Sequence, residues 1–242
     1  MIDDGVFGAE VAATYDTQHA GLAAEIPQIT QVLKDLSAGG PILEFAIGTG
    51  RIALPLATLG CEVAGIEISG AMVAELRKKE TGTAMRVDIG DMTTTDLGTG
   101  FALVFLVFNT IDNLTTQDAQ IACFENAARH LAPGGRFLIE TQVPPVQKIP
   151  FGERISVFSN KPDYLGFDDI DVATQLYSST HVRVENGVTD RFSVPFRYAW
   201  PAEMDLMAKL AGMALESRWA DWRGSAFSAT STRHISVWQK PG

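Results

Sequence analysis

Short apolar runs alternate with amphipathic segments through the first 140 residues of the chain. Each run is rich in β-branched residues and bounded by turn residues, which is typical of a buried strand. The predicted strands cover 41–47, 62–67, 85–88, 101–108 and 136–140. The segments beside them predict helices at 11–16, 26–36, 51–59, 71–79 and 116–131. Alternation of this kind predicts a parallel, doubly wound α/β sheet.

The pattern changes after residue 140. Prolines, aromatics and β-branched residues replace helical periodicity from 141 to 200, and Asn186-Gly187 is a hairpin signal between strands at 173–185 and 188–200. A helix over 202–214 and strands near 215–222 and 234–239 follow. We therefore expect 1–140 to form N-terminal helices and the cofactor-binding core, 141–200 an antiparallel β insertion serving as substrate lid, and 201–242 the completion of a seven-stranded sheet.

A glycine turn joins the first predicted strand to the helix after it. Gly48 and Gly50 permit backbone angles and a ligand approach that a β-carbon hinders, and the helix directs free N–H groups toward the turn. A crevice of this kind binds nucleotides in open α/β sheets. Gly48-x-Gly50-x-x-Ala53 satisfies the dinucleotide fingerprint, and Glu67 follows Gly48 by 67 − 48 = 19 positions, as a ribose-binding carboxylate does.

Glu44, just before the turn, favours a positively charged ligand over a dinucleotide. A carboxylate at the mouth of the loop repels a pyrophosphate but attracts a ligand that carries an ammonium and a sulfonium group. S-adenosylmethionine is such a ligand, since it combines adenine and ribose with positive charge and has no phosphate. The spacing of the turn alone leaves both cofactor classes open.

Composition narrows the class of partner. The chain has 242 residues, of which 46% are hydrophobic and 20% charged, and its net charge is −10, which disfavours nucleic acid and anionic membranes as partners. The acidic start, 1–4, has no signal-peptide pattern, and no apolar run approaches the length of a membrane span. Cys61 and Cys123 lack metal-ligand spacing, so free thiols are expected. We expect a cytoplasmic monomer or homodimer that acts on a small molecule.

Several segments resemble the class I S-adenosylmethionine-dependent methyltransferases. The segment 44–50 matches the acid-x-G-x-G-x-G motif with Ala46 in place of its first glycine, and 65–69, 90–92 and 131–135 match the ends of later units. More closely, 107–120, 195–207 and 233–238 resemble a bacterial, largely actinobacterial group of small-molecule methyltransferases, over nearly the whole chain. The resemblance implies a Rossmann-like, mostly parallel sheet with an antiparallel last strand. It also implies S-adenosylmethionine as methyl donor and S-adenosylhomocysteine as product.

The expected cofactor site gathers residues from several loops. Glu67 is expected to accept hydrogen bonds from the ribose hydroxyls, Asp91 and Met92 to meet the adenine, and Glu44 to hold the amino-acid end. Structural alternatives exist: Glu67 as a solvated strand end, Met92 as core, and Arg51 as a partner of Glu44 rather than of the cofactor carboxylate. The full expected set is Tyr15, Glu44, Ala46, Gly48, Gly50, Arg51, Glu67, Ile68, Met72, Asp91, Met92, Phe108, Asn109 and Asn113.

Methyl transfer is an in-line displacement at carbon, and alignment supplies much of its acceleration. A base is needed only when the acceptor arrives protonated. Candidate bases are His19, Asp112, Tyr177, His181 and His234. Asp112 and His181 are the expected catalytic residues, together with Tyr15 on an N-terminal lid. The competing interpretations are a surface-loop aspartate, a plain sheet histidine and ordinary helix packing. His234 is expected to be structural.

Two departures from the group bear on the chemistry. Asp112 stands where an apolar residue is expected, and Ala102 replaces the usual aspartate of the fourth strand. No two of the candidate histidines share metal-ligand spacing, so no metal is expected. Aromatic residues of the insertion are expected to divide by strand face between an acceptor pocket and a small core of the insertion itself: Tyr164, Phe167, Tyr177, Phe192, Phe196, Tyr198 and Trp200.

The sequence thus predicts a methyltransferase acting on nitrogen or oxygen, rather than carbon, of a small, planar or apolar metabolite. One alternative is an NAD(P)-dependent reductase on the same glycine turn, which Glu44, the segment 90–92 and the lack of a Tyr-x-x-x-Lys pair disfavour. The other is a non-catalytic S-adenosylmethionine-binding protein, because Ala102 removes an acidic residue and no base is defined.

Overall fold

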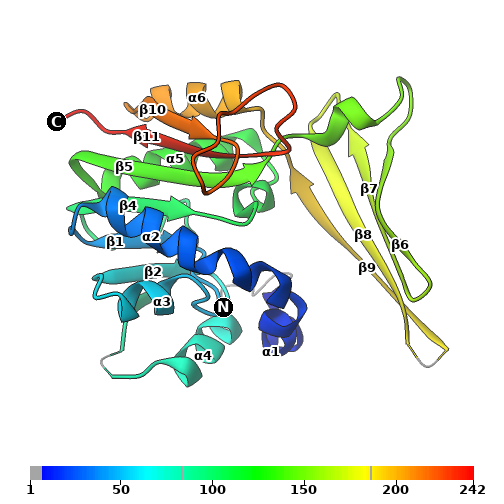
Figure 1. Cartoon of the computed structure of the whole chain (residues 1–242), viewed down its shortest axis with the longest axis horizontal. Helices are drawn as coiled ribbons and strands as arrows, with labels where there is room; N and C mark the ends of the chain where they lie inside the picture. The colour runs from blue at the N-terminus through cyan, green and yellow to red at the C-terminus, as the bar shows by residue number, and fades with distance from the viewer. Residues whose placement is uncertain (1–6, 83, 186) are drawn as a thin grey trace.

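The computed structural model describes residues 7–82, 84–185 and 187–242. Its main sheet has seven strands in the order β10-β11-β5-β4-β1-β2-β3 (Figure 1). The strands are β1 Ile42–Phe45, β2 Val63–Glu67, β3 Arg86–Ile89, β4 Phe101–Leu106, β5 Leu131–Gln142, β10 Ala214–Trp219 and β11 Arg233–Gln239. β1 to β5 pair in parallel, whereas β11 runs antiparallel to both β5 and β10. The predicted doubly wound sheet with an antiparallel last strand is confirmed.

Helices cover both faces of this sheet, and strand alternation explains why. Ile42 packs on the face that holds Leu33 of α2, whereas Leu43 packs on the opposite face with Phe124 of α5. Both faces are therefore apolar, as expected for buried parallel strands. The helices are α1 Ala9–Gln18, α2 Ile26–Ser37, α3 Ala53–Thr58, α4 Gly70–Lys79, α5 Gln117–His130 and α6 Pro201–Leu210, with 3₁₀ turns η2 Ala20–Glu25, η3 Thr110–Asn113 and η4 Pro145–Lys148.

A second, antiparallel sheet extends away from the first at the carboxyl ends of its parallel strands (Figure 1). Its strands, in spatial order, are β6 Ile155–Lys161, β7 Tyr164–Asp171, β8 Leu176–Glu185 and β9 Val188–Arg197. The predicted hairpin is present, since Glu185 of β8 pairs with Val188 of β9; Asn186 of the predicted turn lies outside the described residues. Buried Arg197 fixes this sheet to the helices through an ion pair with Glu203 of α6 at 2.7 Å and a hydrogen bond to Gln120 of α5.

Three predicted boundaries near the glycine turn and β4 were wrong. α3 begins at Ala53, so Arg51 belongs to the turn and does not open the helix. β4 ends at Leu106, because Phe108 and Asn109 adopt left-handed backbone angles, φ 59° and 60°, that end a strand. β5 begins at Leu131 instead of 136, and its pairing with β4 shifts register between Phe101 and Leu103. No helix in the described part of the chain combines the length and apolarity needed to cross a membrane.

His234 is buried near the start of β11 and has a testable effect on stability. Its Nδ1 lies 2.8 Å from the Ser236 hydroxyl, and burial lowers its pKa to about 4. Between that value and the pKa of about 6.5 of an unfolded histidine, the unfolded chain binds more protons, so the free energy of unfolding falls as the pH drops from 6.5 to 4. We expect this to cost about 2 kcal/mol by pH 5.

Urea unfolding at pH 7 and pH 5 checks this prediction. The variant His234→Asn should lose about 2 kcal/mol less than the native chain over that interval, whatever its stability at pH 7. Equal losses in both proteins would show that His234 does not titrate in this way.

Candidate functional site

The carboxylate of Glu67 organises the glycine turn. Glu67 is buried at the end of β2, where its Oε2 accepts a hydrogen bond from the Gly48 N–H at 2.8 Å and its Oε1 one from the Ser69 N–H at 2.9 Å. β1 and β2 are parallel neighbours with Phe45 opposite Ile66, so the residues after them meet at one edge of the sheet. Ser69 also caps α4 by accepting from the Met72 N–H, as predicted. The alternative interpretation of Glu67 as a solvent-exposed strand end is therefore wrong.

Close packing requires glycine at position 50 of the turn. Gly50 has φ 79°, and a β-carbon there would lie 3.0 Å from side-chain atoms of both Leu54 and Leu76. Ala46 also adopts a left-handed angle, φ 52°, at the position where the family motif has its first glycine. An alanine in that conformation is strained by about 1 kcal/mol or more, and such strain clusters at ligand sites.

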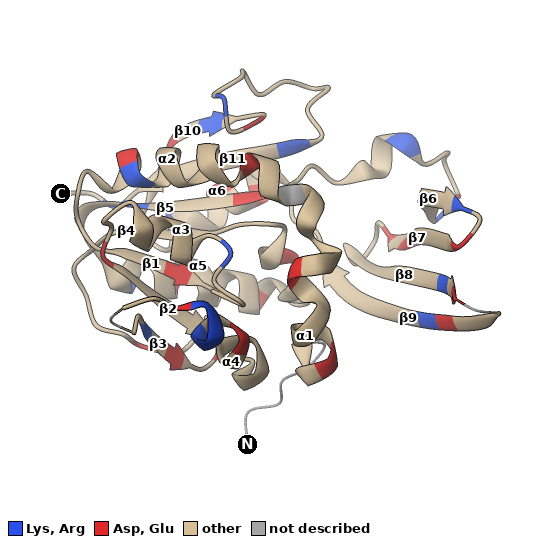
Figure 2. Cartoon of the chain, turned by 60° about the horizontal axis from the view of Figure 1, so that its bottom comes forward, with Lys and Arg blue, Asp and Glu red and all other residues tan. Residues whose placement is uncertain are grey.

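An open crevice of about 360 Å³ lies over this turn. Its lining comes from β1, the glycine turn up to the N-cap of α3, the segment after β4, and α1: Tyr15, Glu44, Phe45, Ala46, Ile47, Gly48, Thr49, Arg51, Ile52, Val107, Phe108 and Thr110. Tyr15 reaches the crevice from α1. Asp16 holds α1 against the turn by accepting a hydrogen bond from Thr49, and against α4 by accepting one from Lys79, each at 2.6 Å. Lys79 belongs to the basic last turn of α4, coloured blue in Figure 2.

Two ionisable side chains in the crevice, one acidic and one basic, have hydrogen-bonding atoms that no described residue uses. Glu44 is 4% exposed, and among the described residues its Oε2 has no hydrogen-bond partner; the buried Nη1 atom of Arg51 has none there either. The Arg51 guanidinium lies 4.4 Å from the Phe108 ring centre and 5.2 Å from that of Tyr15. Burial, with Glu67 nearby, raises the pKa of Glu44 well above its usual range. Unsatisfied buried polar atoms are costly, so this site fits a ligand bearing both an amine and a carboxylate.

The remaining expected cofactor residues differ in their exposure and in their hydrogen bonds. Asp91 is exposed and accepts hydrogen bonds from the Thr93 N–H and hydroxyl, both at 2.7 Å, whereas Met92 packs in the core beside α5. Ile68 is 37% exposed, and Met72 is buried in α4. Asn109 accepts from the Gln142 N–H at 2.7 Å, and Asn113 donates to the Thr110 carbonyl at 3.2 Å.

Asp112 is buried, so its interpretation as a surface-loop aspartate is wrong. It is 1% exposed, because η3 packs against both β9 and β5. Its Oδ2 accepts hydrogen bonds from the Tyr177 hydroxyl at 2.9 Å and from Gln142 Nε2 at 3.2 Å, and its Oδ1 one from Thr141 at 3.4 Å. Burial raises the pKa of Asp112 to about 7, against the lowering effect of these hydrogen bonds.

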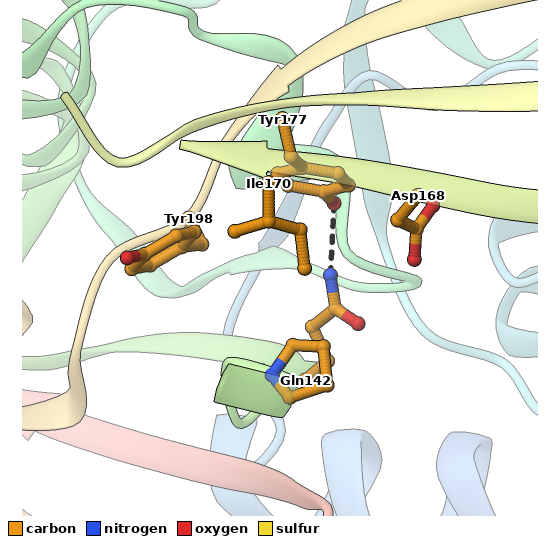
Figure 3. Close-up of a pocket in the computed structure, with 6 residues that line it drawn as sticks. Gln142, Asp168, Ile170, Tyr177 and Tyr198 are labelled. Atoms are coloured by element: carbon orange, nitrogen blue, oxygen red, sulfur yellow. Dashed lines mark hydrogen bonds between the residues drawn. The ribbon is translucent and has the colours of Figure 1, made fainter. Parts of the chain in front are cut away.

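A second, narrow pocket lies on the other side of Tyr177. It is lined by Gln142, Pro145, Asp168, Ile170, Tyr177 and Tyr198, and Figure 3 shows the Gln142 amide donating to the Tyr177 oxygen, a contact of 2.8 Å. Tyr177 thus touches both the pocket and the buried carboxylate. Burial and Asp112 keep its pKa above the usual range, so Tyr177 stays protonated at neutral pH.

The other candidate bases do not reach this pocket's lining. His181 lies further along β8, where its Nδ1 is 2.7 Å from the Tyr164 hydroxyl and its ring stacks on Phe192. Burial lowers its pKa, so it is neutral at pH 7. His19 packs on Tyr15 in the N-terminal helices, 4.3 Å between ring centres. Among the residues that the structure describes, no three His, Cys, Asp or Glu side chains come together as a metal site.

Sequence reasoning missed Gln142, Thr141 and Asp168. Gln142 and Thr141 end β5 at the sheet edge where η3 follows β4, and polar residues at that edge are the signal that points to them. Asp168 alternates with Phe167 along β7, so one faces the pocket and the other the opposite side of the second sheet. The predicted division of the insertion's aromatic residues between the two faces is wrong for its strands, because the register places Tyr164, Tyr177, Phe192 and Phe196 on the face of Asp168 and only Phe167 on the opposite face.

Comparison with known proteins agrees with this architecture. A family model described as Methyltransferase domain matches residues 42–135. The methyltransferase CcbJ from Streptomyces caelestis is 32% identical, with a TM-score of 0.85 over 99% of this chain and 100% of that chain. CalS10, an amino pentose methyltransferase from Micromonospora echinaspora solved with S-adenosylmethionine bound, is 19% identical, with a TM-score of 0.71 over 93% of this chain and 96% of that chain. Cypemycin N-terminal methyltransferase from a Streptomyces species is 24% identical over 99% of this chain and 100% of that protein.

Fold, crevice and relatives together define a class I S-adenosylmethionine-dependent methyltransferase, and the chain belongs to that family. Within the family it is of the actinobacterial type that the sequence resembles. As a member of this family it is an enzyme whose cofactor is S-adenosylmethionine, and loss of the methyl group leaves S-adenosylhomocysteine as the product. The nicotinamide-dependent reductase and the non-catalytic binding protein are not supported.

Proposed function

We propose that this enzyme methylates an amine nitrogen of a small molecule that binds in the pocket beside Tyr177. The observation that carries the proposal is Asp112, a buried carboxylate whose pKa is about 7 and which contacts the pocket through Tyr177. General bases work best when their pKa lies near the operating pH. In this proposal, residues 141–200 form the acceptor wall, and 1–140 with 201–242 form the core that holds the methyl donor.

The crevice over the glycine turn is proposed to hold S-adenosylmethionine, which supplies a methyl group activated by its positive sulfur. Glu44 and Arg51 would satisfy its amine and carboxylate with their unused atoms, and Glu67 would accept from the ribose hydroxyls. Asp91 and Met92 would lie at the adenine, and Tyr15 would cover the methionine end from α1. Ala46, Gly48, Gly50, Ile68, Met72, Phe108, Asn109 and Asn113 would complete the surroundings.

The proposed proton route leads from the acceptor to Asp112. The lone pair of the amine forms the new nitrogen–carbon bond while the carbon–sulfur bond breaks and its electron pair stays on sulfur. The lone pair is made available beforehand, when the ammonium form of the acceptor gives a proton to the Tyr177 oxygen as the Tyr177 proton passes to Oδ2 of Asp112 at 2.9 Å. Gln142 holds both oxygens in place by donating toward each. Asp112 afterwards releases the proton to solvent.

Nitrogen is favoured over oxygen by the strength of this base. An ammonium group is acidic enough to give its proton to a carboxylate with a pKa of about 7, and the neutral amine then has the lone pair that attacks. An alcohol is a far weaker acid and would need a stronger base to attack. Two relatives point the same way by name: one methylates the N-terminus of cypemycin, and the other is an amino pentose methyltransferase.

A mass-shift screen tests the proposal. The purified enzyme is incubated with S-adenosylmethionine and matched pairs of amino and hydroxy compounds, among them amino sugars, their hydroxyl analogues, and short peptides with free or acetylated N-termini. We expect one methyl group or more to be added to amines, with equimolar S-adenosylhomocysteine, and none to the matched alcohols. Methylation of the hydroxyl partner alone, or of acetylated peptides as fast as free ones, would refute nitrogen as the acceptor.

A further inference from the structure

The acceptor pocket contains a second carboxylate, Asp168, that the proposed methyl transfer does not use. We infer that Asp168 binds a second cationic group of the acceptor, so that the preferred substrates carry two amines: one that is methylated beside Tyr177 and one held by Asp168. This inference rests on the proposed function and extends it to the class of substrate.

Strand pairing places Asp168 close to Tyr177 on one face of the second sheet. Ile170 of β7 pairs with Tyr177 of β8, and Asp168 pairs with Ser179. Asp168 and Tyr177 are therefore diagonal neighbours, which lie about 7–8 Å apart on the same face of an antiparallel pair. Both line the same pocket, and Figure 3 shows the Asp168 carboxylate to one side of the Tyr177 ring, with Ile170 and Tyr198 on the other.

The pocket is acidic, and among the described residues Arg197, whose charge lowers the pKa of Asp112, is already paired with Glu203. None of its lining residues is Lys or Arg, and Asp112 adds a second carboxylate behind Tyr177. Among the described residues, no Lys or Arg forms an ion pair with Asp168, which is half-buried and hydrogen-bonded to Ser179. His181, beyond Ser179, is neutral because burial lowers its pKa.

A half-buried carboxylate without a cation is costly, and a cationic ligand group removes that cost. The next residue along β7 provides the contrast. Asp169 lies on the opposite face of the sheet, where it pairs with Arg154 at 2.7 Å. The two neighbouring aspartates thus differ in what they face: Asp169 meets a cation of the protein, whereas Asp168 meets the pocket.

Calorimetric titration separates this role from a general attraction for amines. The enzyme, saturated with S-adenosylhomocysteine, is titrated with linear diamines from 1,3-diaminopropane to 1,6-diaminohexane, and with the monoamines of equal chain length. We expect at least one diamine to bind about fivefold or more tighter than its monoamine. In Asp168→Asn this ratio should fall to about one, whereas Asp169→Asn, which alters only an exposed ion pair, should keep it.

The outcomes distinguish this inference from the proposed function. A ratio near one in the native enzyme, no binding of any amine, or an unchanged ratio in Asp168→Asn overturns the second subsite. Equal weakening of monoamine and diamine in Asp168→Asn also overturns it, because Asp168 would then hold only the reacting amine. An Asp168-dependent ratio, with no methylation of any amine when the diamines are added to the mass-shift screen, would support the subsite and refute the proposed function. Amine methylation with a ratio of one would do the reverse.

Discussion

Asp112→Asn is expected to lower kcat by about 10²- to 10³-fold, within the range that general acid–base catalysis contributes. Asparagine has nearly the same shape, and its oxygen can still accept the hydrogen bond that Tyr177 donates at 2.9 Å in the native enzyme. It cannot take up a proton, so the route through Tyr177 ends at that hydroxyl. The measurement is turnover of the best amine from the mass-shift screen, at saturating concentrations of both substrates.

The pH dependence of kcat tests this prediction most directly. The working form of Asp112 is the carboxylate, and burial raises its pKa to about 7, so the native rate should rise with pH through about 7 and then level off. Asp112→Asn should lack that inflection. Asp118→Asn, on the exposed first turn of α5, is the matched control and should keep both rate and profile.

Binding of S-adenosylhomocysteine separates a catalytic defect from misfolding. Asp112 is not part of the crevice lining over the glycine turn, so Asp112→Asn should bind the product with native affinity. A variant that binds normally, turns over at the native rate and retains the inflection would remove Asp112 from the mechanism.

The sheet and the cofactor side could be predicted because their signals are local. The run from Pro41 to Ile47, the glycine turn and Glu67 lie within one strand–turn–helix–strand unit, and parallel pairing of β1 with β2 brings them together in any doubly wound sheet. The serine cap of α4 depends only on residues within its first turn. Short-range pattern was therefore sufficient for this half of the molecule.

The acceptor side could not be predicted in the same way, because its contacts are long-range. Asp112 bonds to Tyr177, 65 positions further along the chain, and to Gln142, 30 positions away. Whether Asp112 is exposed depends on how β9 of the second sheet packs against η3, and no periodicity in the local sequence predicts that contact. Arg51 was misplaced for a related reason: α3 starts later than its apolar pattern suggests, which leaves Arg51 in the turn against Phe108.

Glu67 is the residue whose loss should most weaken cofactor binding. Both of its oxygens already accept backbone N–H groups, from Gly48 and Ser69. Each carboxylate oxygen has capacity for a further hydrogen bond, so the same group can hold the glycine turn and the ribose hydroxyls at once. Hydrogen bonds to a charged acceptor contribute about 1.5–3 kcal/mol each.

Glu67→Ala should therefore raise the Kd for S-adenosylhomocysteine by about 10- to 100-fold, the equivalent of one such bond, and more if the turn loosens. Glu62→Ala is the matched control, since Glu62 is exposed just before the same strand and should bind as the native enzyme does. Glu67→Gln separates the two roles of the carboxylate, because an amide can still accept from Gly48 but presents a donor where Ser69 needs an acceptor. Native affinity in a folded Glu67→Ala would assign Glu67 to the turn alone and leave the ribose to other groups.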